Sequence, residues 1–204
     1  MAKTIGEPRN ARSRRTCSAI LNATRQVIET EGFETLTMAA VAQRAGVSRR
    51  AVYLHFTSRA DLLSALLRHL GEAEELGQSL ERVWAAPDAV SAVDEWARHL
   101  ARAHPRILPI ARAVEEVRRT DADAAELREA IMERWRKGCR RLATWLEDEG
   151  RLAIPWTVDA AADMMWALMS WDLLEGLTIE RDWSQERYAE AMALLLRSTF
   201  VRQA

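Results

Sequence analysis

Residues 37–56 read TMAAVAQRAGVSRRAVYLHF, and this stretch decides the fold of the amino-terminal part of the chain. It predicts two short helices, one after Thr37 and one after Ser48, because both residues are favoured helix N-caps. A tight turn at Ala45-Gly46-Val47 separates them, and Gly46 supplies the left-handed backbone conformation that such a turn requires. The pattern is typical of a helix-turn-helix, a motif whose second helix enters the major groove of DNA.

The start of the second predicted helix carries side chains suited to that task. Arg49 and Arg50 follow the Ser48 cap directly, and a guanidinium group can bridge O6 and N7 of guanine. Tyr53 lies one turn further on, where its hydroxyl can donate a hydrogen bond to a phosphate. The alternative interpretation makes the two arginines solvated charges and Tyr53 a core residue.

Three further residues flank the predicted second helix. Arg44 ends the helix before it and Arg59 begins the helix after it, so we expect both to touch the DNA backbone. His55 is a candidate DNA contact. A histidine beside Phe56 is, however, more commonly a packed or capping residue.

Charge is distributed unevenly along the chain. Residues 1–70 hold 11 basic and 5 acidic side chains, whereas the rest of the chain holds 18 basic and 25 acidic ones. A basic amino-terminal part suggests a polyanion-binding module, although a solvated arm would give the same balance. Residues 1–11 are expected to be a disordered arm, which could also reach a minor groove or a phosphate through nearby arginines: Arg9, Arg12, Arg14 and Arg15.

Apolar residues recur at helical spacing along nearly the whole chain, and no long segment alternates with period two. This periodicity predicts an all-α fold of about nine helices, beginning with a three-helix, homeodomain-like helix-turn-helix domain. The expected helices span about residues 12–31, 38–45, 49–55, from 58 to beyond Leu70, 87–103, 106–120, 123–149, 157–179 and 184–201. We expect a break after His104-Pro105 and a weakened stretch near Gly71 and Gly77.

Over about residues 16–70 the chain resembles the TetR family of bacterial transcriptional regulators. The resemblance rests on residues 33–37, Ala45-Gly46-Val47-Ser48, Val52-Tyr53, His55-Phe56, Ser58-Arg59 and Leu62-Leu63. It implies that Thr37, Ser48, Tyr53 and Arg59 contact phosphates and that exposed residues of the second short helix read bases. Arg50 departs from the family pattern, because many relatives have a small residue there.

The resemblance also implies two domains, with DNA binding in residues 1–57 and effector binding and dimerisation in residues 58–204. All eight tryptophans lie beyond residue 80, and an apolar or aromatic effector would suit a cavity that some of them line. Most of them are expected to pack the core. Candidate cavity residues are Trp96, Met132, Trp135, Trp166 and Met169.

Residues 157–179 are apolar nearly all round, and residues 184–201 have more than one apolar stripe. A helix without a polar face must be covered on several sides, so we expect this pair to pack on its own chain and on a second copy. The family resemblance implies that the same pair of helices forms the dimer interface, which we call the seam. Candidate seam residues are Met164, Leu168, Trp171, Met192, Leu195 and Phe200.

Several functional classes are disfavoured by what the sequence lacks. The longest segments without a charged residue span nine residues, whereas a membrane helix needs roughly 20 apolar residues. We find no catalytic triad spacing, metal-binding motif or glycine-rich phosphate loop, so we expect no enzyme, metal or cofactor. Two distant cysteines fit a reducing cytoplasm.

Taken together, these features predict a cytoplasmic homodimer that binds double-stranded operator DNA. A repressor released by a small-molecule effector is the favoured interpretation. A helix-turn-helix regulator without a small-molecule ligand, responding to a protein instead, and an activator are the alternatives.

Overall fold

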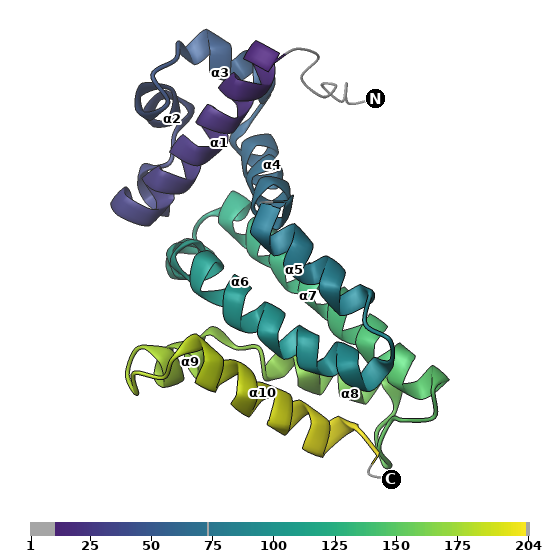
Figure 1. Ribbon diagram of the computed structural model, residues 1–204. Helices are drawn as coiled ribbons and strands as arrows, with labels where there is room; N and C mark the ends of the chain where they lie inside the picture. Colours follow the sequence, from purple (N-terminus) through teal and green to yellow (C-terminus); the bar gives the residue numbers. More distant parts are fainter. Residues whose placement is uncertain (1–10, 73, 203–204) are drawn as a thin grey trace. The chain divides into compact units, whose positions relative to one another are not determined.

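The computed structural model describes residues 11–72 and 74–202, apart from the side chains of residues 71–75. Within this range the chain is helical, and the predicted all-α fold is confirmed (Figure 1). None of the described helices is long and apolar enough to cross a membrane. The elements are α1 (Ala11–Glu31), η1 (Phe33–Thr35), α2 (Met38–Arg44), α3 (Arg49–His55), α4 (Arg59–Glu72), α5 (Glu74–Trp84), α6 (Ala89–Val117), α7 (Ala122–Asp148), α8 (Val158–Ala167), α9 (Trp171–Thr178) and α10 (Gln185–Phe200).

The chain forms two compact units. The first comprises the residues up to Gly71 together with Pro109–Ala130, and the second comprises Glu72–Leu108 together with Ile131–Ala204. Helices α6 and α7 therefore each contribute to both units. The boundary expected between residues 57 and 58 separates a DNA-binding domain from an effector-binding domain. It divides the chain by function and not into compact units, so it stays a prediction.

The first unit is built on α1, with α2 packed against α1 and α3 against α2 (Figure 1). Each of these helices buries one side. Helix α4 joins the same unit with buried leucines, and the adjoining segments of α6 and α7 bury their own apolar residues. The core residues are Ile20, Val27, Ile28, Phe33, Leu36, Val41, Val52, Phe56, Leu62, Leu63, Leu66, Ile110, Val114, Ala124 and Leu127.

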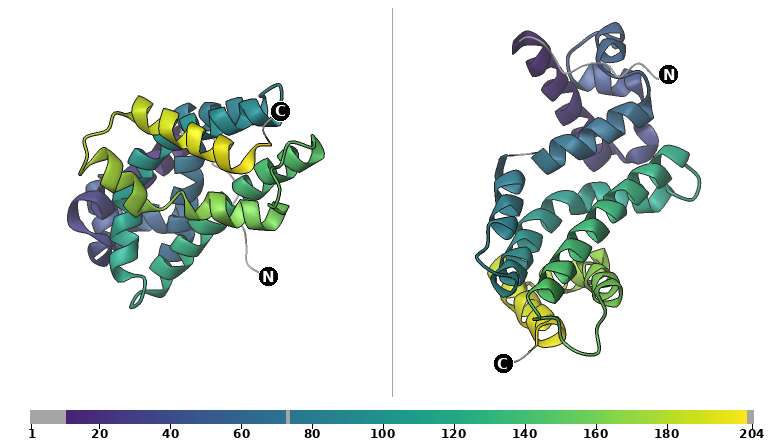
Figure 2. Two further views of the ribbon diagram at one scale, coloured as in Figure 1. Left: turned by 90° about the horizontal axis from the view of Figure 1, so that it is seen from below. Right: turned by 90° about the vertical axis from the view of Figure 1, so that its right-hand side faces the viewer.

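The second unit has a continuous apolar core to which α6, α7, α8 and α10 all contribute. Figure 2 gives two further views of these helices. Tyr188 and Phe200 of α10 are almost fully buried in this core, as are Leu142 and Leu146 of α7. Since one side of α10 is used here, only its other side is available to solvent or to a partner.

Helix α6 contradicts the break expected after His104-Pro105. It runs without interruption from Ala89 to Val117 and includes both Pro105 and Pro109. A proline inside a helix removes one hydrogen bond and costs about 3 kcal/mol or more. Burial of the helix on both sides of Pro105, from Leu100 to Leu108, offsets that cost.

The single helix predicted for residues 157–179 is also wrong. Helix α8 ends at Ala167, and α9 begins at Trp171 after a new N-cap. The hydroxyl of Ser170 accepts a hydrogen bond from the backbone N–H of Leu173 at 3.2 Å, which starts the second helix. The apolar residues all round this segment therefore belong to two shorter helices.

We predict that Gly138→Ala destabilises the second unit. A β-carbon on Gly138 of α7 would overlap Cη2 of Trp96, whose ring is buried and has Trp84 and His99 as aromatic neighbours. Overpacking of about 1–3 kcal/mol outweighs the helical gain of up to about 1 kcal/mol for alanine. Gly176→Ala is the matched control, because nothing lies within 4 Å of its β-carbon. Urea denaturation should show a lower midpoint for the first variant only; equal midpoints would contradict this packing.

We also predict that stability falls between pH 6.5 and 5 and that His104 accounts for part of the loss. Burial lowers the pKa of His104 to about 3, with a further contribution from His99. Burial likewise lowers the pKa of His99 to about 4, helped by Arg102 and Arg134. Below pH 6.5 the unfolded chain therefore binds protons that the folded chain does not, so stability is complete above this range and declines as the pH falls.

Each of these two histidines contributes up to about 1.4 kcal/mol per pH unit in that range. His104→Phe keeps an aromatic ring beside Trp135, with which His104 stacks at 4.8 Å, and removes one titrating group. Urea denaturation at pH 7, 6 and 5 should give a shallower pH dependence for the variant than for the wild type. If stability depended on pH equally steeply in the variant and the wild type, the neutral state of buried His104 would not be a cause of the loss of stability at low pH.

Candidate DNA-binding site

Both predicted caps are in place around the turn. The Thr37 hydroxyl oxygen accepts a hydrogen bond from the N–H of Ala40 at 3.0 Å, and the Ser48 hydroxyl oxygen accepts one from the N–H of Ala51 at 3.1 Å. Each hydroxyl still has its own proton to donate. The two exposed caps can therefore fix the helices and offer donors to a phosphate at the same time.

The turn between α2 and α3 depends on Gly46. Its φ is +65°, a conformation that costs little only for glycine. The N–H of Val47 then donates to the carbonyl of Ala42 at 3.0 Å and closes the end of α2. This geometry brings the chain directly from α2 into the Ser48 cap and fixes where α3 begins.

Helix α3 has a buried side and an exposed side. Val52 is fully buried, whereas Arg49 and Arg50 are exposed, and Tyr53 and Leu54 expose 47% and 67% of their surface. Arg50, Tyr53 and Leu54 have the i, i+3, i+4 spacing of neighbours on one helix face. The predicted core role of Tyr53, weighed as an alternative, does not fit this exposure.

The charged residues around α3 differ in whether they are already paired. Arg49 and Arg50 make no ion pair among the described residues. Arg44, by contrast, pairs with Glu31 at the end of α1. The two guanidinium groups at the start of α3 thus need to break no internal contact to bind DNA, whereas that of Arg44 does.

Arg59 is held most firmly, in a group that we call the Arg59 cluster: Arg59, Asp121 and Asp123. Its Nη2 lies 2.6 Å from both carboxylate oxygens of Asp121, and its Nε lies 2.7 Å from Oδ2 of Asp123. Its guanidinium carbon also lies 5.4 Å from the centre of the Phe33 ring. Burial alone would lower the pKa of Arg59, but these hydrogen bonds outweigh it and raise the pKa. The predicted phosphate contact is therefore bound to carboxylates in this structure.

His55 is half-buried, with its ring centre 6.1 Å from that of Phe56. This position suits the packed role weighed for it, and its DNA contact stays a prediction. The expected arm lies outside the described residues, except for Ala11, which opens α1.

Two features of this site were missed by sequence reasoning. Leu54 could have been found, because its helical spacing from Arg50 places it on the exposed side of α3. Asp121 and Asp123 could not, since they are 62 and 64 positions from Arg59 and the chain between them carries no signal of the pairing.

The five candidate effector residues do not share one environment. Trp96 and Met169 are buried in the core of the second unit, whereas Met132, Trp135 and Trp166 are half-buried. Trp135 belongs to an aromatic cluster with His104 and Trp171, at centre-to-centre distances of 4.8 Å from the first and 4.5 Å from the second. The oxygen of Tyr188 lies 3.5 Å from Nδ1 of His104. An effector role stays a prediction for all five.

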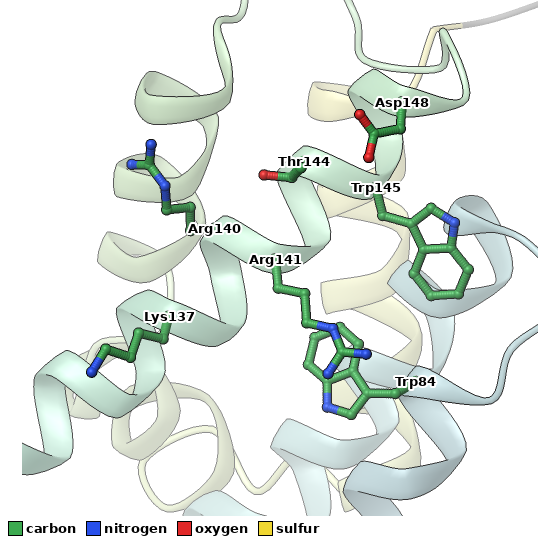
Figure 3. A pocket seen from close by; sticks show the side chains of 7 residues that line it. All are labelled: Trp84, Lys137, Arg140, Arg141, Thr144, Trp145 and Asp148. Carbon is green, nitrogen blue, oxygen red and sulfur yellow. The ribbon is translucent and has the colours of Figure 1, made fainter.

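An open hollow of about 540 Å³ lies elsewhere in the second unit and contains none of those five residues. Figure 3 shows its side chains, with the Arg141 guanidinium over the ring of Trp84 at 4.0 Å. The lining combines three basic side chains and one carboxylate with two tryptophans, so it is not the wholly apolar cavity predicted from the tryptophans. It consists of Trp84, Lys137, Arg140, Arg141, Thr144, Trp145 and Asp148.

The candidate seam residues divide by burial. Met192 and Phe200 are buried in their own unit and have almost no surface for a partner, so they form core rather than a free face. Met164 and Leu195 expose 43% and 39% of their surface, and Leu168 and Trp171 are half-buried. Leu194, next to Leu195, is 63% exposed.

Comparison with known proteins points to one family. Residues 20–66 match the family described as bacterial regulatory proteins, tetR family. An uncharacterized HTH-type transcriptional regulator of Pseudomonas putida, TtgW, is 33% identical over 88 residues, which are 41% of this chain. The match spans 62% of the length of TtgW, less than two thirds of it.

Solved structures share the fold over nearly the whole chain. NalD, the secondary repressor of the MexAB-OprM multidrug efflux pump in Pseudomonas aeruginosa, has a TM-score of 0.71 at 22% identity, covering 94% of this chain and 98% of its own. SmeT in complex with triclosan has a TM-score of 0.69 at 19% identity, covering 93% of each chain. At these identities the likeness concerns the fold alone.

The matched residues 20–66 contain the capped helices, the Gly46 turn and the exposed arginines described above. The helical fold of the rest of the chain agrees with that assignment. Residues 20–66 are therefore identified as the helix-turn-helix DNA-binding domain of the TetR family of bacterial regulatory proteins.

Proposed function

We propose that the protein is a sequence-specific regulator of transcription that reads operator DNA with α3. One observation carries this proposal: Arg49 and Arg50 are exposed at the capped start of a helix whose other side is buried, and neither forms an ion pair within residues 11–72 and 74–202. Guanidinium groups in that position suit the O6 and N7 edge of guanine. Thr37, Ser48 and Tyr53 would contact phosphates, and residues 1–57 would form the DNA-binding domain.

We infer that two copies bind together. The exposed sides of α8 and α10 present apolar residues at helical spacing, with Met164 between Ala160 and Ala167, and Leu194-Leu195 after Ala191. A two-fold contact through these sides would cover them. Two reading helices could then bind half-sites one helical turn apart, about 34 Å, or a multiple of it.

We further propose that the protein is a repressor and that an apolar or aromatic effector, bound in residues 58–204, releases it from DNA. NalD is a repressor, and SmeT was crystallised with triclosan, a fact about that protein that supports an effector here. In this chain, Trp135 and Trp171 beside His104 provide aromatic surface. Loss of DNA binding on adding an apolar aromatic compound would test this part.

We predict that Arg50→Ala and Tyr53→Phe weaken DNA binding in different ways. Loss of the Arg50 guanidinium should remove about 1–3 kcal/mol of discrimination at one base pair. Loss of the Tyr53 hydroxyl should weaken binding to all sequences by a similar factor, because phosphates are the same at every step. Competition titrations with duplexes from the promoter region of its own gene, each changed at one position, would separate the two effects.

Arg44→Ala is a control with a different expected outcome, because the Arg44 charge is already paired with Glu31. It should change affinity less than Arg50→Ala does. If Arg50→Ala lowered affinity equally for every duplex, Arg50 would not be a base-reading residue. If the wild type bound no duplex, the proposed function itself would be wrong.

We predict that Leu195→Glu converts the dimer into monomers. At a two-fold contact the substitution places a charge in the interface of both copies. Each leucine lost removes about 1.5–3 kcal/mol of burial free energy, so the dimer dissociation constant should rise at least about 100-fold. Ile179→Glu is the control, since Ile179 is 62% exposed but lies at the end of α9. Sedimentation would measure the oligomeric state of both variants. A Leu195→Glu variant that remained dimeric would exclude this seam.

A further inference from the structure

The Arg59 cluster joins α4 to the turn between α6 and α7. Asp121 caps α7, accepting a hydrogen bond from the N–H of Ala124 at 3.1 Å, and Asp123 lies in the first turn of α7. Both carboxylates bind Arg59, and all three residues belong to the first unit. Two carboxylates and one guanidinium leave the cluster with one net negative charge.

The cluster lies close to the proposed reading helix along the chain. Arg59 is four residues beyond His55, the last residue of α3, so at most about 14 Å of chain separates them. The start of α4 is also fixed: the Ser58 hydroxyl accepts from the N–H of Asp61 at 3.1 Å, and the Asp61 carboxylate accepts from the N–H of Thr57 at 2.9 Å. A charge at Arg59 therefore lies within about two Debye lengths of the end of α3 and can influence DNA that binds to this helix.

We propose that Asp121 and Asp123 set the DNA affinity of this protein by holding Arg59 away from the DNA backbone. The proposal rests on the DNA-binding function proposed above. Two carboxylates bind Nε and Nη2 of Arg59 and compensate its charge, so Nη1 is left to reach a phosphate while the surplus negative charge of the cluster repels DNA. Arg59 binds a phosphate with its full charge and with both edges of the guanidinium only when its contacts with Asp121 and Asp123 open.

The position of these carboxylates gives the rest of the chain a means of regulating DNA binding. Helices α6 and α7 meet at the turn that carries Asp121. The part of α6 up to Leu108 and the part of α7 from Ile131 onward belong to the second unit. A ligand of the second unit that shifted either helix along its axis would move the carboxylates relative to Arg59. Its effect on DNA affinity would then depend on these two aspartates.

The test is the double variant Asp121→Asn with Asp123→Asn. Asparagine keeps the cap on α7 and removes both charges. The double variant should bind duplex DNA about five- to tenfold more tightly at physiological salt, and its affinity should fall more steeply with salt, by about one unit in the log–log slope. Asp123→Asn alone should give an intermediate gain in affinity for duplex DNA. This single variant replaces the double variant in the test if the double variant does not fold.

Two further variants identify Arg59 as the group that is released. Arg59→Gln should cancel the gain when it is added to the double variant. Glu115→Gln is the control, because Glu115 is likewise a carboxylate ion-paired with arginine in the same unit, in its case with Arg118 and Arg128. It should leave affinity and salt slope within about twofold of the wild type.

The outcomes separate this proposal from the one on which it rests. No duplex binding by the wild type would reject the DNA-binding function. Binding by the wild type with no gain, or with a loss, in the folded aspartate variants would overturn the role of the Arg59 cluster alone. An equal gain from Glu115→Gln would also overturn it, since net charge rather than the release of Arg59 would then be the cause.

Discussion

The proposed reading surface depends on the burial of one side of a helix of seven residues. Helix α3 (Arg49–His55) is too short to be stable in water by itself. It forms because Ser48 caps its start and because Val52, with Phe56 just after it, is buried in the first unit. The same burial orients the helix, since the residues that cannot be buried, Arg49 and Arg50, are left on its outer side.

The arginines around α3 differ in how many carboxylates they are paired with. Counting only partners in the part of the chain that the structure describes, Arg49 and Arg50 have no carboxylate partner, Arg44 has one and Arg59 has two. Pairing with an internal carboxylate competes with pairing to a phosphate, so each residue should contribute less to DNA affinity as its number of internal partners rises. Arginines held in this way suit the proposed release from operator DNA, because a small movement changes their availability.

Local signals made the helix-turn-helix predictable from sequence. Thr37, Gly46 and Ser48 each act on the backbone within a few residues, and the structure has all three in the predicted roles. Signals that depend on packing were less reliable. Pro105 was expected to end a helix, but burial around it outweighs the lost hydrogen bond, and the cap at Ser170 was missed among apolar neighbours. The pairing of Arg59 with Asp121 joins residues 62 positions apart, and no local pattern indicates it.

The proposed contact between α3 and guanine can be tested with single-atom changes in the DNA. Replacing one operator guanine at a time by 7-deazaguanine removes only the N7 acceptor. We predict that at one or two positions this lowers wild-type affinity by about 1 kcal/mol or more, and that Arg50→Ala abolishes the loss at one of them. Affinity that is insensitive to every such replacement, or equally sensitive in Arg50→Ala, would contradict the claim that α3 reads the major groove through its exposed guanidinium groups.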